Sequence, residues 1–232
     1  MGKKNKIKNK KIRNQINQAP LTAVDVVIFT VEEKILKIIL IKIKSGPLKG
    51  MWAFPGWRVK IHETLDKAAA RELYENTTIK NAYLEQLYSF SSVKRDPVGR
   101  IISVAYLALV NFIDAKLKTS SRYLDIRWFP VEQIPRLAYD HKEMLNHALE
   151  RLKNKLEYSN VIYSLLPRKF TLSDLQKAYE IILQKKIDKR NFRKKILSLN
   201  LIKKVGEKRG EAYRPANLYS FKKRKFSVAE IF

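Results

Sequence analysis

The 232-residue chain contains no cysteine, which excludes disulfide bonds, thiol catalysis and metal sites with cysteine ligands. It also contains no apolar run long enough to span a membrane, and the basic start of the chain is not followed by the apolar core of a signal peptide. These absences suit a reducing cytoplasm, so we expect a cytoplasmic protein with no membrane partner. Its hydrophobic content of 45% still allows a sizeable core, in one large domain or two small ones.

Acidic residues are scarce at both ends of the chain, so the net charge of +26 is unevenly distributed. Residues 1–18 contain seven Lys/Arg and no acid, and residues 151–232 contain 22 Lys/Arg against 7 acids. Residues 19–150 carry a net charge of only +4. Polycationic ends favour a polyanionic partner, above all nucleic acid. The competing interpretation is a general lysine bias that aids solubility.

The apolar periodicity divides the chain into three parts. Residues 1–18 have no strong apolar period and predict a disordered basic arm, followed by an α+β domain at 19–156 and a second domain at 157–232. Within the α+β domain the patterns predict strands at 24–31, 36–44, 83–90, 101–112 and 126–129, and helices at 64–77 and 139–156.

The second domain has the order helix, helix, helix, hairpin. A short apolar helix is predicted at 161–166, and Thr171 with Asp174 forms a variant capping box that opens the next helix. Asp188 is a good N-cap for a helix at 188–199, and strands at 201–205 and 218–221 enclose a basic loop. This order is typical of a winged helix-turn-helix.

Helix 188–199 has one apolar and one basic face, and the residues expected to face the core are Phe192, Ile196, Leu197 and Leu199. Arginine and asparagine can form paired hydrogen bonds to base edges, and lysines can lie near phosphates. We therefore predict DNA contacts from this helix, from the start of the preceding helix and from the hairpin loop; they are Lys189, Arg190, Asn191, Arg193, Lys194, Thr171, Ser173, Lys208, Arg209 and Arg214. An ordinary solvated basic face is the alternative.

A cluster of acidic side chains lies on helix 64–77. Glu72 and Asn76 are four residues apart and share a face, with Glu75 beside them. Carboxylates grouped in this way can hold Mg²⁺ for a phosphate substrate, and Arg71 can pair with Glu75 or Glu63. A charged solvent face of an ordinary helix has the same spacing.

The segment 56–79 resembles a Nudix box, in which Gly and five residues precede Glu, and seven more precede Arg-Glu-aliphatic-x-Glu-Glu-x-Gly-aliphatic. The matching residues are Glu63, Arg71, Glu72, Leu73, Glu75 and Ile79, whereas Trp57, Asn76 and Thr78 depart from the pattern. The last glutamate is a metal ligand in active Nudix enzymes, so the resemblance implies weakened Mg²⁺ binding and inefficient hydrolysis. We expect no required cofactor and no functioning catalytic set: Glu63, Arg71, Glu72 and Glu75 are remnants of the box, with Glu72 and Glu75 as candidate magnesium ligands.

The resemblance extends over about residues 20–221 to the Nudix-related transcriptional regulators. It is carried by the degenerate box together with the segments 52–56, 83–88, 95–100, 103–106, 140–141, 170–172, 188–193 and 214–219. The fold it implies is α+β, a Nudix-like α/β/α sandwich followed by a winged helix-turn-helix. The function it implies is a homodimeric repressor on a palindromic double-stranded DNA operator, released by a small phosphorylated effector. ADP-ribose, a product of NAD metabolism, and sugar phosphates are the effectors of such regulators.

The residues expected to bind the effector are Lys42, Trp52, Arg58, Glu72, Arg95 and Arg100, while His141 is expected to be a local structural partner. Two alternatives stay open at this point. One is a weak Mg²⁺-dependent pyrophosphohydrolase acting on ADP-ribose or a related nucleoside diphosphate derivative. The other is a nonspecific nucleic-acid binder, for which salt but not sequence would control the affinity.

Overall fold

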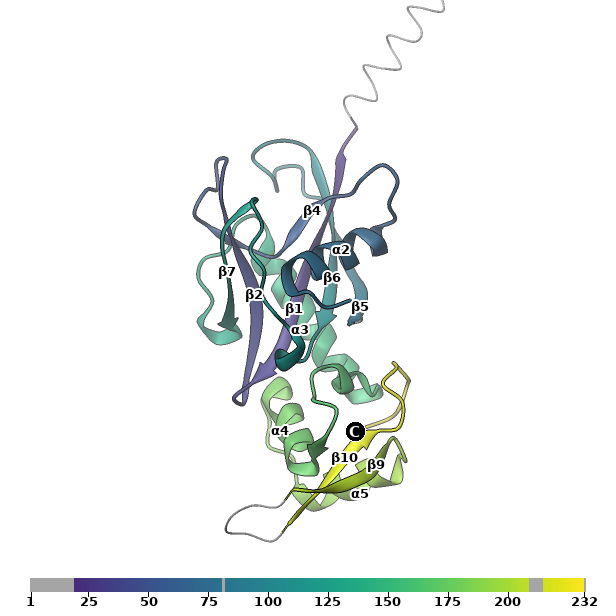
Figure 1. The fold of residues 1–232 in the computed structure, drawn as a ribbon. Helices are drawn as coiled ribbons and strands as arrows, with labels where there is room; N and C mark the ends of the chain where they lie inside the picture. Colours follow the sequence, from purple (N-terminus) through teal and green to yellow (C-terminus); the bar gives the residue numbers. More distant parts are fainter. Residues whose placement is uncertain (1–18, 81, 209–214, 232) are drawn as a thin grey trace, which may run out of the picture.

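A computed structural model of the chain describes residues 19–80, 82–208 and 215–231. The predicted basic arm at 1–18 and the predicted DNA contacts Arg209 and Arg214 lie outside the described residues. A sheet flanked by helices forms the upper part of the molecule in Figure 1, and a smaller helical domain lies below it.

In the described part of the chain, seven strands form one mixed sheet with the order β3-β2-β1-β6-β5, to which β4 and β7 add by pairing with β1 and β2. The strands are β1 (Leu21–Glu32), β2 (Ile35–Ile43), β3 (Trp52–Ala53), β4 (Gly56–Arg58), β5 (Tyr83–Phe90), β6 (Ile101–Leu109) and β7 (Tyr123–Pro130). The predicted pair of strands 24–31 and 36–44 is confirmed as the antiparallel pair β1–β2. Strands β1 and β6 run parallel, with Leu21 opposite Ile101.

Helices α2 (Leu65–Thr77) and α3 (His141–Tyr158) cover opposite faces of this sheet (Figure 1). Successive side chains of a strand point to opposite faces, so the β-branched run of β1 serves two cores. Val26 and Ile28 pack in one core with Leu73 of α2, whereas Val27 packs in the other with Met144 of α3. The predicted α/β/α sandwich is confirmed.

Several predicted boundaries differ from the structure, and two of the differences have a clear local cause. The strand predicted at 101–112 ends at Leu109, because the Asn111 side chain accepts the Ile113 N–H at 2.9 Å and starts the 3₁₀ turn η1 (Phe112–Asp114). The helix predicted from residue 139 begins at His141, since Tyr139 adopts a left-handed conformation with φ of +52°. A 3₁₀ turn η2 (Val131–Gln133) precedes it in the chain.

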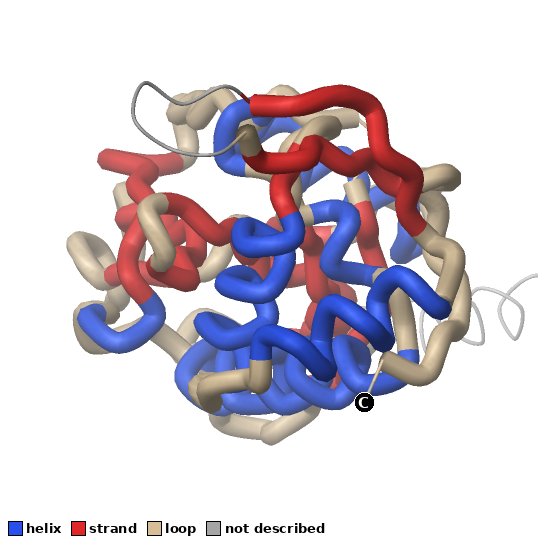
Figure 2. The backbone as a smooth tube through the Cα atoms, turned by 90° about the horizontal axis from the view of Figure 1, so that it is seen from below, coloured by secondary structure: helices blue, strands red, loops and turns tan. Residues whose placement is uncertain are grey.

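The second domain has the predicted order of elements and the predicted winged helix-turn-helix fold. It contains the 3₁₀ turn η3 (Val161–Ser164), α4 (Leu172–Leu183), α5 (Lys189–Ser198) and a three-stranded sheet of β8 (Phe170–Thr171), β10 (Ala216–Phe221) and β9 (Ile202–Lys208). Figure 2 shows the paired strands β9 and β10 beside the helices of this domain. Gln184 takes the left-handed position between α4 and α5, with φ of +54°, where a glycine is often found.

The predicted caps of both helices are confirmed. Thr171 and Asp174 form a reciprocal capping box at the start of α4. The Asp188 carboxylate accepts the Asn191 N–H at 2.8 Å at the start of α5. Phe192 and Ile196 are buried as predicted, but Leu197 is 48% exposed, because it lies one position beyond Ile196 on the turn of the helix.

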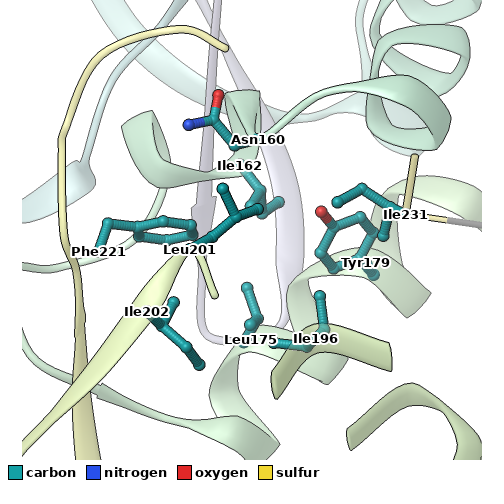
Figure 3. A pocket seen from close by; sticks show the side chains of 9 residues that line it. All are labelled: Asn160, Ile162, Leu175, Tyr179, Ile196, Leu201, Ile202, Phe221 and Ile231. Carbon is teal, nitrogen blue, oxygen red and sulfur yellow. The ribbon is translucent and has the colours of Figure 1, made fainter. Parts of the chain in front are cut away.

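The core of the second domain contains a cavity of about 10 Å³. Apolar side chains from several elements converge on it, including Leu175 of α4, Ile196 of α5 and Ile231 of the C-terminal segment (Figure 3). A cavity of this size holds at most about one water molecule, so it is a packing gap and not a ligand site.

The C-terminal segment 222–231 returns from the hairpin to the junction of the two domains. The backbone N–H groups of Ala229 and Ile231 donate to the carbonyls of Tyr158 and Glu157 at the end of α3, both at 2.8 Å. Phe226 lies 5.7 Å from the Tyr83 ring of β5, measured between centroids. One hydrophobic cluster therefore continues from the sheet domain into the second domain. Within the described residues, none of the helices is both long and apolar enough to cross a membrane.

Candidate effector cleft and nucleic-acid interface

A cleft of about 820 Å³ opens at one end of the sheet domain. Its walls come from β1, β2, β4, the loop before β6, the start of β7 and the start of α3. The charged and aromatic side chains among these walls are Asp25, Lys44, Phe54, Trp57, Arg58, Arg95, Asp96, Arg122, Tyr123, Tyr139 and His141. Four cations, two carboxylates and several aromatic rings thus line the cleft, which suits an anionic ligand that also has a flat ring.

Arg95 is the most enclosed cation of the cleft. Its guanidinium donates to the Asp140 carboxylate through Nε at 2.8 Å and Nη2 at 2.7 Å, and it lies 3.8 Å from Asp25. Burial disfavours the charged form, but the two carboxylates outweigh it and raise the pKa of Arg95. Arg95 is therefore a permanent cation that ties the loop before β6 to the start of α3.

His141, the first residue of α3, is buried and lines the cleft. Its Nδ1 accepts the backbone N–H of Phe54 at 2.9 Å, which assigns the proton of the neutral ring to Nε2. Burial lowers the pKa of His141, although Asp25, 3.7 Å away, acts in the opposite direction. This agrees with the expected role of a local structural partner.

Gly56 allows β4 to approach β1 at the floor of the cleft. A Cβ atom at this position would lie 2.1 Å from Asp25 Oδ1 and 2.4 Å from the Val24 carbonyl oxygen. Any other residue would therefore displace β4, and with it Trp57 and Arg58.

The remnants of the Nudix box form an ion-pair network. Arg71 donates to Glu63 at 2.6 and 3.1 Å and also contacts Glu72. The hydrogen bonds from Arg71 hold the pKa of Glu63 at about 2. Of the partners predicted for Arg71, Glu63 is found, whereas Glu75 instead pairs with Arg122 at 2.6 Å.

Arg122 is the residue of this site that sequence reasoning missed. It lies directly before β7, and its guanidinium also donates to Glu72 at 3.1 and 3.3 Å. The same group lies 4.9 Å from the centre of the Trp57 ring. Nothing around Arg122 in the sequence suggests this role, since about fifty residues separate it from the box and only the paths of α2 and β7 join them.

The site does not fit magnesium. Mg²⁺ requires nearly octahedral oxygen ligands and is usually bound through carboxylates. The Glu72 carboxylate is occupied by Arg71 and Arg122, and Glu75 is occupied by Arg122. The Asn76 Oδ1 atom is buried without a hydrogen-bond partner, but it is neutral, and the Asn76 amide donates to the Glu72 carbonyl. The described residues contain no group of three acidic or histidine side chains that could hold a metal ion.

The residues predicted to bind the effector are only partly brought together. Arg58 and Arg95 line the cleft. Lys42 and Trp52 lie outside its walls and contact each other, with Nζ 5.8 Å from the ring centre. Glu72 lies beneath Arg122, and Arg100 donates to the carbonyls of Ser91 and Ser92 at 2.9 and 3.2 Å.

Helix α5 carries half of the predicted DNA contacts, and all of these except Arg193 are exposed. Lys189, Arg190, Asn191 and Lys194 are exposed, while the opposite face of the helix is buried in the core. The sequence pattern of the helix therefore translates directly into a basic outer surface.

Arg193 differs from these residues, because it is half-buried and its Nη2 donates to the Ser173 hydroxyl at 3.2 Å. The Thr171 hydroxyl is engaged in the capping box with Asp174. The structure thus places Arg193, Ser173 and Thr171 together at the start of α4. Lys208, in β9, is exposed, and so are Lys203 and Lys204 on the same strand, which were not predicted.

Comparison with known proteins finds two domain families in the chain. Residues 19–148 match the NUDIX domain, and residues 162–221 match the NrtR DNA-binding winged helix domain. The chain is 38% identical over 207 residues to the ADPR responsive transcriptional repressor NtrR of Acinetobacter baylyi, covering 88% of this chain and 82% of the relative.

Two solved structures are also similar. NrtR of Shewanella oneidensis complexed with a 27mer DNA has a TM-score of 0.78 and 35% identity, covering 87% of this chain and 93% of that one. The NUDIX domain of the same Shewanella protein complexed with ADP ribose has a TM-score of 0.53 and 32% identity, covering 60% and 92%. The chain belongs to the family of Nudix-related transcriptional regulators that carry an NrtR DNA-binding winged helix domain.

Proposed function

We propose that this chain is a transcriptional repressor that binds operator DNA through its winged helix and is released when ADP-ribose binds in the cleft. The observation that carries the proposal is the exposed cationic face of α5 on a winged helix-turn-helix domain. Its side chains are of the types that contact phosphates and base edges in the major groove. The relatives named above supply the class of effector.

The chemistry of the cleft supports an ADP-ribose-like ligand. Arg58 and Arg122 can meet the two phosphates, because guanidinium groups form strong charge-assisted hydrogen bonds with them. The rings of Trp57 and Tyr139 offer apolar surface to an adenine or a ribose. A sugar phosphate would use the same cations but fewer of the rings.

Helix α3 is the proposed connection between effector and DNA. Its first residue, His141, lines the cleft, and its last turn binds the C-terminal segment through Glu157 and Tyr158. Eighteen helical residues span about 27 Å, so α3 joins the two regions as one rigid element. Effector binding would favour one position of α3 and thereby shift the population of DNA-competent molecules.

We further propose that a homodimer acts on the operator in the cytoplasm. Residues 19–156 would bind the effector and residues 157–232 would bind DNA, with the boundary near the end of α3. Two winged helices related by a twofold axis would bind half-sites about 34 Å apart, or a multiple of that distance. A palindromic operator is the expected consequence.

The decisive experiment selects bound sequences from a random duplex library at about 0.15 M salt, with and without ADP-ribose. We expect a palindromic motif that disappears when ADP-ribose is added. A motif that ADP-ribose does not change would support a sequence-specific repressor but exclude ADP-ribose as its effector. The absence of any motif would contradict the repressor function. Low salt must be avoided, because a chain with a charge of +26 then binds any DNA.

The alternative of a weak pyrophosphohydrolase requires that Glu72 and Glu75 be available to a metal ion. Both are bound by Arg122, which argues against it. Mg²⁺-dependent turnover of ADP-ribose that Glu72→Gln abolishes would favour the hydrolase.

A further inference from the structure

Arg122 occupies the centre of the remnant Nudix box. Three hydrogen bonds from its guanidinium reach Glu72 and Glu75, at 2.6, 3.1 and 3.3 Å. The Glu72 side chain has no exposed surface, and the Arg122 side chain is 19% exposed. A buried carboxylate is stable only beside compensating cations, which for Glu72 are Arg122 and Arg71.

The same guanidinium faces the cleft. It lies over the rings of Trp57 and Tyr123, at 4.9 and 5.2 Å from their centres. A guanidinium has five N–H donors, of which three are used here by the carboxylates. The others remain for a ligand in the cleft that Arg122 lines.

We propose that Arg122 is a built-in cation that stands in for the magnesium ion of this site, so that the chain binds the phosphates of its effector without any metal. This rests on the proposed function, in which the cleft binds a nucleoside diphosphate. The fixed cation neutralises Glu72 and Glu75 and presents positive charge to the ligand. Unlike a metal with bound water, it brings no nucleophile, so binding does not lead to hydrolysis.

Two departures from the Nudix pattern agree with this role. Trp57, in place of glycine, provides the aromatic face on which the guanidinium stacks. Asn76, in place of the last glutamate, removes a carboxylate that Arg71 and Arg122 would otherwise have to neutralise together with Glu72 and Glu75. Both substitutions therefore favour an arginine, instead of a metal ion, as the cation of the box.

The direct test measures Mn²⁺ binding to the full chain by electron paramagnetic resonance, without any nucleotide. We expect the wild type to bind Mn²⁺ weakly at this site, and Arg122→Ala to bind it at least about tenfold more tightly, because Glu75 is then released and Glu72 keeps only Arg71 as a partner. The added Glu72→Gln substitution should abolish that gain. Arg127→Ala is the matched control, because Arg127 is an exposed arginine of β7, the strand that follows Arg122, and pairs with Asp125. Tight Mn²⁺ binding by the wild type that Glu72→Gln removes would overturn the proposal.

A second measurement needs no variant, in case Arg122→Ala does not fold. Calorimetric titration of the wild type with ADP-ribose should give the same affinity in EDTA and in MgCl₂. An affinity that requires Mg²⁺ would contradict the proposal that Arg122 replaces the metal, although ADP-ribose would remain the effector. No binding in either buffer would instead remove ADP-ribose from the proposed function, and the Mn²⁺ measurement would still decide the role of Arg122.

Discussion

Arg95 donates two parallel hydrogen bonds to Asp140, at 2.7 and 2.8 Å, across 45 residues of chain. The pair is enclosed, since the Arg95 side chain is only 4% exposed. It fixes the loop before β6 against the start of α3, at the wall of the cleft. Arg95 thus has a structural partner of its own, whatever it contributes to the effector.

We expect Arg95→Ala to lower the free energy of unfolding by about 3 kcal/mol, because it leaves Asp140 and Asp25 without their cation. Urea denaturation measures this loss. Arg127→Ala, which breaks an exposed pair, should cost less than about 1 kcal/mol. Equal effects of the two substitutions would show that the enclosed pair contributes no more to the free energy of unfolding than the exposed pair.

The lowered pKa of His141 predicts a dependence of stability on pH. Above pH 6.5 the ring is neutral in both states and contributes nothing. Below pH 6.5 the unfolded chain binds a proton that the folded chain rejects, so the free energy of unfolding falls by up to about 1.4 kcal/mol per pH unit until the folded pKa is reached. Urea denaturation between pH 7.5 and 5.5 should show a shallower slope for His141→Gln than for wild type. Parallel slopes would contradict the assignment.

Ile231 is 2% exposed and closes the core of the winged helix domain beside Tyr179 (Figure 3). We expect Ile231→Ala to lower the free energy of unfolding by about 3 kcal/mol, because it enlarges the existing cavity. Val228→Ala is the control in the same segment, since Val228 is 74% exposed and should change stability by less than about 0.5 kcal/mol. A negligible loss in Ile231→Ala would mean that the C-terminal segment does not support this core.

Arg190 and Lys208 should contribute differently to DNA binding. Arg190→Ala is expected to reduce discrimination between operator and random DNA by about tenfold or more, because arginine reads base edges. Lys208→Ala should weaken binding to all sequences about equally and reduce the dependence on salt. Fluorescence anisotropy with both duplexes over a series of salt concentrations separates the two effects. Lys142→Ala, an exposed lysine of α3, is the control for loss of one charge. Unchanged operator preference in Arg190→Ala would show that α5 is not the recognition helix.

The sequence alone determined the elements whose causes are local. Periodicity identified the helices and the longer strands of both domains, but not the short strands β3, β4 and β8. The residue types at Thr171 and Asp188 identified the caps of α4 and α5. Periodicity failed at 101–112 and at 139, where a side-chain hydrogen bond and a left-handed residue ended the pattern. The basic face of α5 could be predicted because one helix presents it.

Only the tertiary structure decided the composition of the cleft. Arg122 meets Glu72 and Glu75, and Arg95 meets Asp140, across about fifty residues in each case, through the pairing of strands and the position of helices on the sheet. The sequence predicted an acidic remnant on α2 and Arg71 as one of its cations, but not Arg122. A carboxylate must find its partner in space when it is buried, and strand pairing, not spacing along the chain, selects that partner.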